Sequence, residues 1–284
     1  MAIPLDRPRL IAILNVTPDS FADGGRHESP AHAADAASQW VAEGAAMIDV
    51  GGESTRPGAP RVPVDEQLRR VIPVIRAIRD RQPAIPISID TTRAEVARAA
   101  IAEGATVIND VSAGLDDPRM LPLAAEMSAG LVLMHRAVPP PADTYSDRYQ
   151  HEPEYPGGVV ACVREFLAAR AQAALDAGVH RDSIVLDPGL GFGKSVAQNL
   201  ELIDGTPELA SLGYPILSAL SRKSFVGRVS LGRDSTPDER LPGTLDLSRR
   251  HRAAGARLFR VHDVAAHAAM FGLSASDSAA SVTA

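Results

Sequence analysis

The chain of 284 residues has a single cysteine, Cys162, which excludes an internal disulfide. Its place in the helical pattern VVACVREFL predicts a buried structural thiol. The net charge is −6 and the arginines are scattered, so the chain lacks a basic field for nucleic acid and we expect no such partner. No run approaches the roughly 20 apolar residues of a membrane-spanning helix. The N-terminal MAIPLDRPRL has no signal-like apolar core, so we expect a cytoplasmic protein.

Lysine and asparagine are also scarce. Of 29 basic residues only Lys194 and Lys223 are lysine, and Asn15, Asn109 and Asn199 are the only asparagines. Arginine and alanine are abundant, so the few remaining lysines and asparagines are candidates for positions where chemistry requires them. The alternative is chance survival, and their location in the fold has to decide.

The stretch VLDPGLGFGKS, residues 185–195, is similar to a phosphate-binding P-loop. However, Pro188 stands where the template has its first glycine, and proline offers no backbone N–H there. The glycines at 189, 191 and 193 also miss the Gly-x-Gly-x-x-Gly spacing of a dinucleotide site. We therefore interpret this stretch as something other than a nucleotide site.

Short apolar runs alternate with helical patterns along the whole chain, which indicates βα units and a parallel sheet. The predicted strands cover about 9–16, 46–52, 86–90, 106–110, 130–135, 184–188, 215–220 and 257–263. The predicted helices cover about 31–44, 65–81, 93–103, 118–128, 158–178, 196–204, 241–255 and 264–272. Eight such units predict a single (β/α)8 TIM barrel within 1–284, with a core over about 9–272 and a disordered tail over about 273–284. A doubly wound open sheet is the alternative.

Polar residues follow every predicted strand, where a barrel of this kind carries its active site. These residues are Asn15, Glu53 to Arg56, Asp90, Asn109 with Asp110, His135, Asp187, Ser221 to Ser224, and Arg260 with His262. Polar groups at strand ends cost desolvation unless they meet partners or a ligand, so their repetition favours a functional rim.

Asp90, Asn109 and Asp187, with Lys223 nearby, combine two carboxylates, an amide and an ammonium. This set can read a planar heterocycle that carries an amidine-like edge. The alternative is a structural network of ion pairs around Lys223.

Arg260 and His262 are two residues apart on one strand and therefore face the same way, beside Asn15 on the first strand. We expect these three to bind an anionic leaving group, with Mg²⁺ on its oxygens and the Asn15 oxygen as a metal ligand. The alternative is a buried histidine bonded to backbone and a structural pair of an arginine with Asp263.

The histidines do not show zinc-site spacing. Three further carboxylates near strand ends, namely Asp49, Asp110 and Asp263, are interpreted as supporting rather than catalytic.

Seven segments, in order from about residue 10 to 265, resemble motifs of the dihydropteroate synthase family. They are ILNVTPDSFADGG (13–25), IDVGGESTRPG (48–58), IDT (89–91), INDV (108–111), DPGLGFGK (187–194), SRKSFVG (221–227) and RVHD (260–263). The first two are highly specific, and the resemblance covers nearly the whole chain.

The resemblance implies condensation of 6-hydroxymethyl-7,8-dihydropterin pyrophosphate with p-aminobenzoate to 7,8-dihydropteroate and pyrophosphate, by a homodimeric Mg²⁺-dependent enzyme. It implies pterin binding by Thr55, Asp90, Asn109, Asp187 and Lys223, and pyrophosphate binding by Asn15, Arg260 and His262. It implies p-aminobenzoate binding by Pro57, Phe192, Lys223 and Ser224. Catalytic roles fall to Lys223 and to Asp23, Thr55 and Arg56 on mobile loops.

The chain departs from the family pattern at two places. Ala219 stands where the family usually has glycine, and a long Pro/Tyr-rich segment follows His135 where the family tends to Met-x-Gly. A non-catalytic pterin-binding paralogue is therefore one alternative. A methyltetrahydrofolate-dependent methyltransferase is another, although such enzymes would lack the 17–25 and 53–58 motifs that are present here.

Overall fold

The structure is a computed structural model that describes residues 5–16 and 29–274. Asp23, the rest of the 17–28 segment and residues 275–284 of the expected tail lie outside the described residues.

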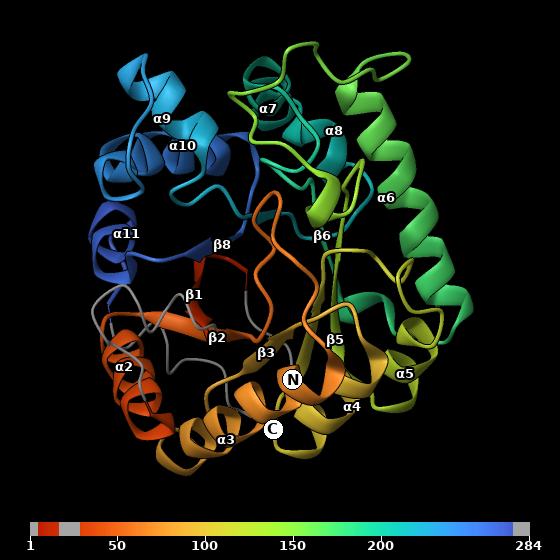
Figure 1. Cartoon of the computed structure of the whole chain (residues 1–284), viewed down its shortest axis with the longest axis vertical. Helices are drawn as coiled ribbons and strands as arrows, with labels where there is room; N and C mark the ends of the chain where they lie inside the picture. The colour runs from red at the N-terminus through yellow and green to blue at the C-terminus, as the bar shows by residue number, and fades with distance from the viewer. Residues whose placement is uncertain (1–4, 17–28, 275–284) are drawn as a thin grey trace.

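The strands form one parallel sheet that closes on itself (Figure 1). They are β1 (Arg9–Asn15), β2 (Ala45–Gly51), β3 (Ile87–Asp90), β4 (Val107–Asp110), β5 (Gly130–Met134), β6 (Ile184–Asp187), β7 (Leu217–Ser218) and β8 (Leu258–Val261). Their order is β6-β5-β4-β3-β2-β1-β8-β7, and an isolated bridge from Leu186 to Ile216 joins the two ends. The predicted (β/α)8 TIM barrel is confirmed, and the open-sheet alternative is wrong.

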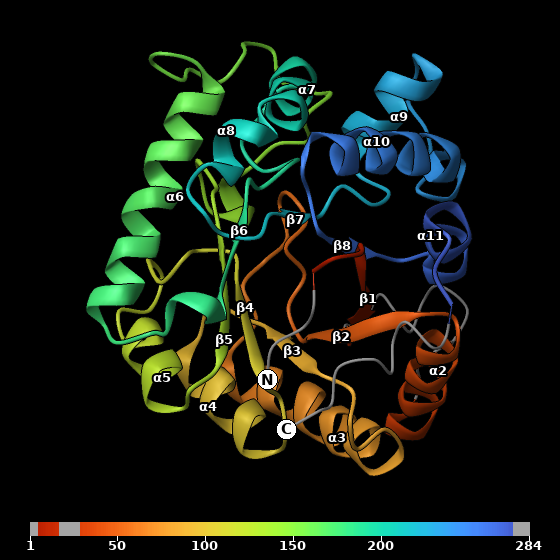
Figure 2. The same cartoon turned by 180° about the vertical axis from the view of Figure 1, so that it is seen from behind.

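Helices surround this barrel on all sides (Figures 1 and 2). They are α2 (Pro30–Ala42), α3 (Val64–Arg81), α4 (Ala94–Ala102), α5 (Met120–Glu126), α6 (Val159–Asp176), α7 (Val196–Asp204), α8 (Thr206–Ala210), α9 (Ser224–Leu231), α10 (Leu241–Ala254) and α11 (Val264–Phe271). Within 5–16 and 29–274, none of them is long and apolar enough to cross a membrane.

The sequence predicted eight of these helices and missed α8 and α9, which are only five and eight residues long. Length alone does not explain the miss, because α5 and α11, with seven and eight residues, were predicted. Both α8 and α9 lie in segments that the prediction left between a strand and a helix. Conversely, α7 agrees with the prediction at both ends, because Ser195 caps its first turn and forms a reciprocal capping box with Gln198.

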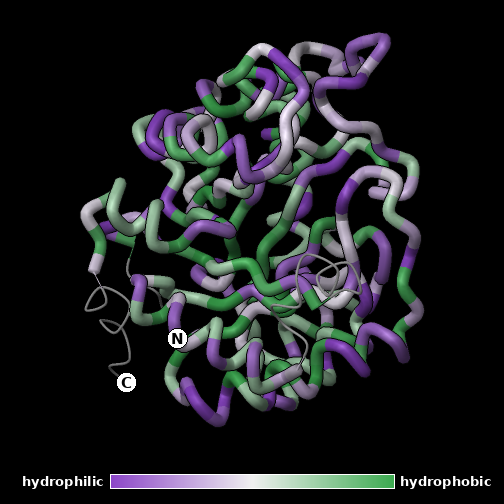
Figure 3. Tube along the Cα trace, turned by 60° about the vertical axis from the view of Figure 1, so that its left-hand side comes forward, coloured by the Kyte–Doolittle hydropathy of each residue, from purple (hydrophilic) through white to green (hydrophobic). Residues whose placement is uncertain are grey.

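Strand alternation decides which side chains enter the barrel. Leu10, Ala12 and Leu14 of β1 pack outward against the helices, whereas Ile11 belongs to a separate cluster inside the barrel. The members of this inner cluster are Ile11, Met47, Val132, Leu217 and Leu258. The tube in Figure 3 shows hydrophobic colour on segments in the middle of the molecule and alternating colours on the segments around them.

The side chains two or four residues beyond this inner cluster also point inward, but at the end of the barrel where the strands finish. We call this end the mouth. Six polar residues point inward in this way: Asn15, Asp49, Asp90, Asn109, Asp187 and Arg260. Asp90 is included because Ser88, two residues before it on β3, donates a hydrogen bond to the inward-facing Asp49. On these six strands the inward-facing side chain nearest the mouth is therefore polar, whereas the interior below it holds the apolar cluster.

Cys162 is not the buried thiol that the sequence predicted. Its side chain is partly exposed, and its Sγ donates a hydrogen bond to the carbonyl of Pro156 at 3.0 Å. The buried stripe of α6 runs through Val159, Val163 and Leu167, four residues apart, and Cys162 lies beside this stripe.

The outer core predicts a clear stability test at Phe259 of β8. This side chain is fully buried, and its ring centroid lies 4.7 Å from that of Phe271. Phe259→Ala leaves a cavity between the sheet and α11, so we expect unfolding in urea to need about 3 to 5 kcal/mol less free energy. The matched control is Leu115→Ala, at a side chain that is 59% exposed, which should change stability by less than about 0.5 kcal/mol. Equal losses for the two variants would contradict this account of the core.

Candidate active site

Three of the predicted pterin residues, Asp90, Asn109 and Asp187, lie at the mouth on β3, β4 and β6. Asp90 lies directly beside Asn109 in the register of β3 and β4, and on its other side it lies beside Gly51 of β2. Asp187 ends β6, next to Met134 of β5. All three predicted polar side chains are buried, with exposures of 3 to 6%.

An arginine joins two carboxylates in this mouth. Arg260 donates from Nε to Oδ2 of Asp49 at 2.6 Å and from Nη2 to Oδ2 of Asp90 at 2.8 Å. Asp49 also accepts from Nδ2 of Asn109 at 3.2 Å and from the hydroxyl of Ser88. Arg260 therefore contacts Asp90, one of the residues predicted to hold the pterin, and Asp49 links Arg260 to Asn109.

Two carboxyl groups of the mouth are perturbed by their burial. Burial raises the pKa of Asp90 to about 7 although Arg260 opposes the shift, and the carboxylates of Asp49 and Glu53 raise it further. Burial likewise raises the pKa of Asp187, against the charge of Lys223. Perturbed carboxyl groups that converge in one place are typical of functional sites.

Lys223 approaches Asp187 from the loop after β7. Its ammonium donates to the carbonyl of Leu190 and lies 4.3 Å from the centroid of the Phe192 ring. Burial lowers the pKa of Lys223 to about 8, although Asp187 opposes the shift. Ser224 follows as the first residue of α9, so the N-terminus of this helix opens beside Lys223.

His262 lies among positive charges. Its Nδ1 is 3.0 Å from the hydroxyl of Ser221, and its backbone N–H donates to the same hydroxyl at 3.2 Å. Burial lowers the pKa of His262 to about 3, and the charges of Arg260, Arg222 and Arg56 lower it further. The ring is therefore neutral near pH 7, in a field that favours an anion.

Asp263 forms the expected structural pair with an arginine, but the partner is Arg222 and not Arg260. It accepts two hydrogen bonds from the guanidinium of Arg222, at 2.9 and 2.6 Å. Asp110 is also occupied elsewhere, because it accepts from the backbone N–H of Ser112 and of Gly114 in the loop after β4.

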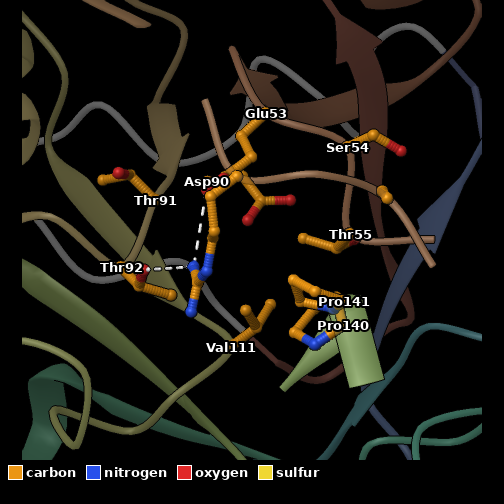
Figure 4. A pocket seen from close by; sticks show the side chains of 11 residues that line it. Glu53, Ser54, Thr55, Asp90, Thr91, Thr92, Val111, Pro140 and Pro141 are labelled. Atoms are coloured by element: carbon orange, nitrogen blue, oxygen red, sulfur yellow. Dashed lines mark hydrogen bonds and ion pairs between the residues drawn. The ribbon is translucent and has the colours of Figure 1, made fainter. Parts of the chain in front are cut away.

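The segment between β2 and α3, residues 52–63, forms one wall of a pocket at the mouth. We call it the β2 loop. Figure 4 shows Thr55 of this loop beside Pro140 and Pro141, with Asp90 and Val111 in the same pocket. The N–H of Gly58 donates to the carbonyl of Pro140 at 2.8 Å. The Pro-rich segment after His135 therefore has an identifiable partner, which the sequence alone did not reveal.

Charged side chains hold the β2 loop on its other side. Arg61 binds Asp116 in the loop after β4 and donates to Thr92 at 3.2 Å, and Arg136 binds the same carboxylate. Glu53 accepts from the backbone N–H of Val62 at 2.8 Å and closes the loop on itself.

Among residues 5–16 and 29–274, no group of three or more His, Cys, Asp or Glu side chains is arranged to hold a metal ion. Asn15 ends β1, and its amide oxygen lies 3.8 Å from the position that a Cβ on Gly51 would occupy, close to Asp90. This oxygen is a hard donor suited to Mg²⁺, which keeps most of its ligands from water and phosphate.

Comparison with known proteins agrees with this geometry. The family described as "Pterin binding enzyme" matches residues 11–262. A protein named dihydropteroate synthase from Streptococcus pyogenes serotype M6 is 46% identical over 258 residues, which are 91% of each chain. The chain belongs to the dihydropteroate synthase family. Members of this family are transferases of folate biosynthesis.

Two solved structures of Xanthomonas albilineans dihydropteroate synthase are similar throughout. One, with 4-aminobenzoic acid, is 44% identical with a TM-score of 0.84, and covers 94% of this chain and 92% of that chain. The other, in complex with 7,8-dihydropteroate, is 42% identical with a TM-score of 0.80, and covers 95% and 93%. The family resemblance drawn from the motifs is thus confirmed over almost the whole barrel.

Sequence reasoning placed Asp49 among supporting residues and did not foresee its contacts with both Asn109 and Arg260. Alternation along β2 could have found it, because Asp49 follows the inward-facing Met47 by two residues. The position of Asp23 lies outside the described residues, so its role in this dihydropteroate synthase relative remains a prediction.

The low pKa of His262 predicts acid-sensitive stability. The imidazole of His262 takes up a proton near pH 6.5 in the unfolded chain but only near pH 3 in the folded protein. The free energy of unfolding therefore falls as pH drops from about 6.5 to about 3. His262→Gln removes this contribution. We expect the loss of unfolding free energy between pH about 7 and about 5, measured in urea, to be smaller in the variant by up to about 2 kcal/mol. The same loss in both proteins would show that His262 titrates normally.

Proposed function

We propose that this chain condenses 6-hydroxymethyl-7,8-dihydropterin pyrophosphate with p-aminobenzoate, giving 7,8-dihydropteroate and pyrophosphate. The observation that carries the proposal is the convergence of buried Asp90, Asn109 and Asp187 with Arg260 and Lys223 at one barrel mouth. The family membership and the two ligands named in the Xanthomonas structures support it.

Asp90, Asn109 and Asp187 would read the pterin. Its ring edge carries an amino group and ring N–H groups that donate to carboxylates, while its carbonyl accepts from Lys223 or from the Asn109 amide. Thr55, on the wall of the same pocket as Asp90, would border the ring. A buried site that is built to hydrogen-bond these groups strongly disfavours rings that lack them.

Asn15, Arg260 and His262 would bind the pyrophosphate, and Arg56 adds to the positive field around His262. When bound, Mg²⁺ would neutralise the departing phosphate oxygens, with the Asn15 oxygen as its protein ligand. Arg260 contacts Asp90 at one end, so it can link recognition of the pterin to the departure of the anion. Electrostatic stabilisation of a leaving group is commonly a large part of catalysis.

The bond changes that we propose are those implied by the family resemblance. The C–O bond between the pterin methylene and pyrophosphate breaks first, and its electron pair stays on the phosphate oxygen. The arylamine nitrogen then attacks the cationic methylene and loses a proton to solvent. Asp23, Thr55 and Arg56 would close the site during this step, since water would otherwise capture the cation.

p-Aminobenzoate would lie between Pro57 and Phe192. Lys223 and the N-terminus of α9 at Ser224 are placed to attract its carboxylate, because helix N-termini carry unpaired N–H groups and a positive dipole end. In this arrangement the amino group of the ring would be directed toward the pterin methylene.

A homodimer, a cytoplasmic location and a tail beginning near residue 273 remain predictions drawn from the sequence and the family resemblance. A single folded domain over the described barrel is part of the same proposal.

The direct test uses the purified full chain with the dihydropterin pyrophosphate, p-aminobenzoate and Mg²⁺. We expect release of pyrophosphate and formation of dihydropteroate in equal amounts, and little release when the arylamine is omitted. Binding of the pterin without pyrophosphate release would support the non-catalytic paralogue instead. Methyl transfer from a methylated folate would support the methyltransferase alternative.

Lys223→Ala tests the pterin site. Loss of a charged hydrogen-bond donor should weaken binding of the dihydropterin pyrophosphate by about 10- to 100-fold, as measured by calorimetry. Arg249→Ala is the control, because this arginine is exposed on α10 and pairs only with the nearby Asp246 among the ion pairs described. An unchanged affinity in Lys223→Ala would remove this residue from the pterin site.

A further inference from the structure

Lys194 is a fully buried lysine to which the proposed reaction gives no role. Its ammonium donates to the carbonyls of Gly189 at 2.9 Å and Phe192 at 2.8 Å, and it lies 3.0 Å from Nδ1 of His135. These three acceptors are neutral groups, so the dipoles of two carbonyls and one imidazole stabilise the buried ammonium. Lysine is seldom fully buried without partners, so the burial of the Lys194 side chain depends on these hydrogen bonds.

The acceptors of Lys194 lie mainly in the segment between β6 and α7, residues 188–195, which we call the β6 loop. The carbonyls of Gly189 and Phe192 turn inward to Lys194. The carbonyl of Leu190 between them accepts instead from Lys223, and the Phe192 ring lies against the same ammonium. Lys194 therefore binds two carbonyls of the β6 loop, and Lys223 binds the carbonyl that lies between them in the sequence.

Two glycines make this close packing possible. Gly189 has φ +67°, and a Cβ there would fall 1.8 Å from the carbonyl oxygen of His135. Gly191 has φ +81°, and a Cβ there would fall 2.7 Å from Cδ of Lys223. The loop is thus pressed against the end of β5 on one side and against Lys223 on the other, with no room for side chains at either contact.

The segment between β5 and α6, residues 135–158, holds the β6 loop from outside. We call it the β5 loop. Oδ2 of Asp143 accepts from the N–H of Gly193 at 3.0 Å, and the hydroxyl of Tyr155 donates to the carbonyl of Gly193 at 2.7 Å. The hydroxyl of Ser195 also donates to Glu152 of the β5 loop, and the Gly189 carbonyl also accepts from the N–H of Phe192 at 3.1 Å. Among the hydrogen bonds of the described residues, the Phe192 carbonyl accepts only from Lys194.

We propose that Lys194 is a positioning residue: by drawing the carbonyls of Gly189 and Phe192 inward, it places the Phe192 ring and the Leu190 carbonyl against Lys223. This proposal rests on the proposed function for the identity of the affected substrate, p-aminobenzoate. Lys194 touches no substrate itself and acts through Phe192 and Lys223.

The electrostatics agree with this geometry. Burial lowers the pKa of Lys194 to about 7, while Asp187 opposes the shift and Lys223 adds to it. Burial, with the charge of Lys194, lowers the pKa of His135 to about 2, so its Nδ1 stays available as an acceptor. The charge of Lys223 therefore acts on Lys194 across a single loop.

The sequence makes the test unusually direct, because Lys194 and Lys223 are the only lysines. Full-length protein labelled with ¹³C at the lysine Cε gives two lysine signals, and Lys194→Met leaves that of Lys223 alone. We expect this signal to shift from its wild-type position and to lose its response to added p-aminobenzoate. An unshifted signal that keeps its response would overturn the proposal.

Kinetics supply the second readout. In Lys194→Met we expect KM for p-aminobenzoate to rise about tenfold or more, because small displacements of positioning groups have large effects, while pterin affinity changes less than about threefold. Val163→Ala, in the buried stripe of α6, is the control for lost stability and should keep the wild-type KM. A matching rise in KM in Val163→Ala would mean that instability alone explains the effect.

His135→Phe keeps the test decisive if Lys194→Met does not fold. It removes the Nδ1 acceptor while preserving a ring against Phe166, whose centroid is 4.9 Å from that of His135. We expect a smaller rise in KM for p-aminobenzoate and a smaller shift of the Lys223 signal, and no change in either would overturn the proposal. Absence of turnover in the wild type would contradict the proposed function, whereas the NMR result would still decide the role of Lys194.

Discussion

The structure of the mouth depends on one constraint: charges buried at the strand ends must be paired within the barrel. Arg260 satisfies two carboxylates at once, Asp49 and Asp90, which belong to neighbouring strands. Removing one partner of such a network leaves an uncompensated buried charge, which commonly costs about 3 to 5 kcal/mol. The same contacts that keep the mouth folded therefore also orient the groups that face a ligand.

The loops extend this arrangement outward. The β5 loop contacts the β2 loop through Pro140 and the β6 loop through Asp143 and Tyr155. It therefore joins the two segments that carry Pro57 and Phe192, the residues expected on either side of p-aminobenzoate. Its sequence departs from the family tendency, yet its position links parts of the site that strand geometry alone would leave independent.

Particular residues show how far sequence reasoning could reach. The eight strands and the position of Asp90, Asn109 and Asp187 at their ends followed from alternating patterns, since each βα unit repeats the same local signal. The short helices α8 and α9, the partly exposed Cys162 and the partners of Asp49 did not follow. Each of these depends on which distant segment packs against it, and local patterns carry no such information.

Lys194 shows most clearly which features the sequence determines and which depend on the tertiary structure. The sequence by itself determined the barrel, the polar mouth and the family, because strand periodicity and strand-end motifs are local properties that repeat along the chain. It marked Lys194 only as a rare lysine in a loop that looked like a nucleotide site. The tertiary structure decided that its ammonium is buried against His135 and the β6 loop carbonyls, since the parallel pairing of β5 with β6 brings the ends of these two strands side by side.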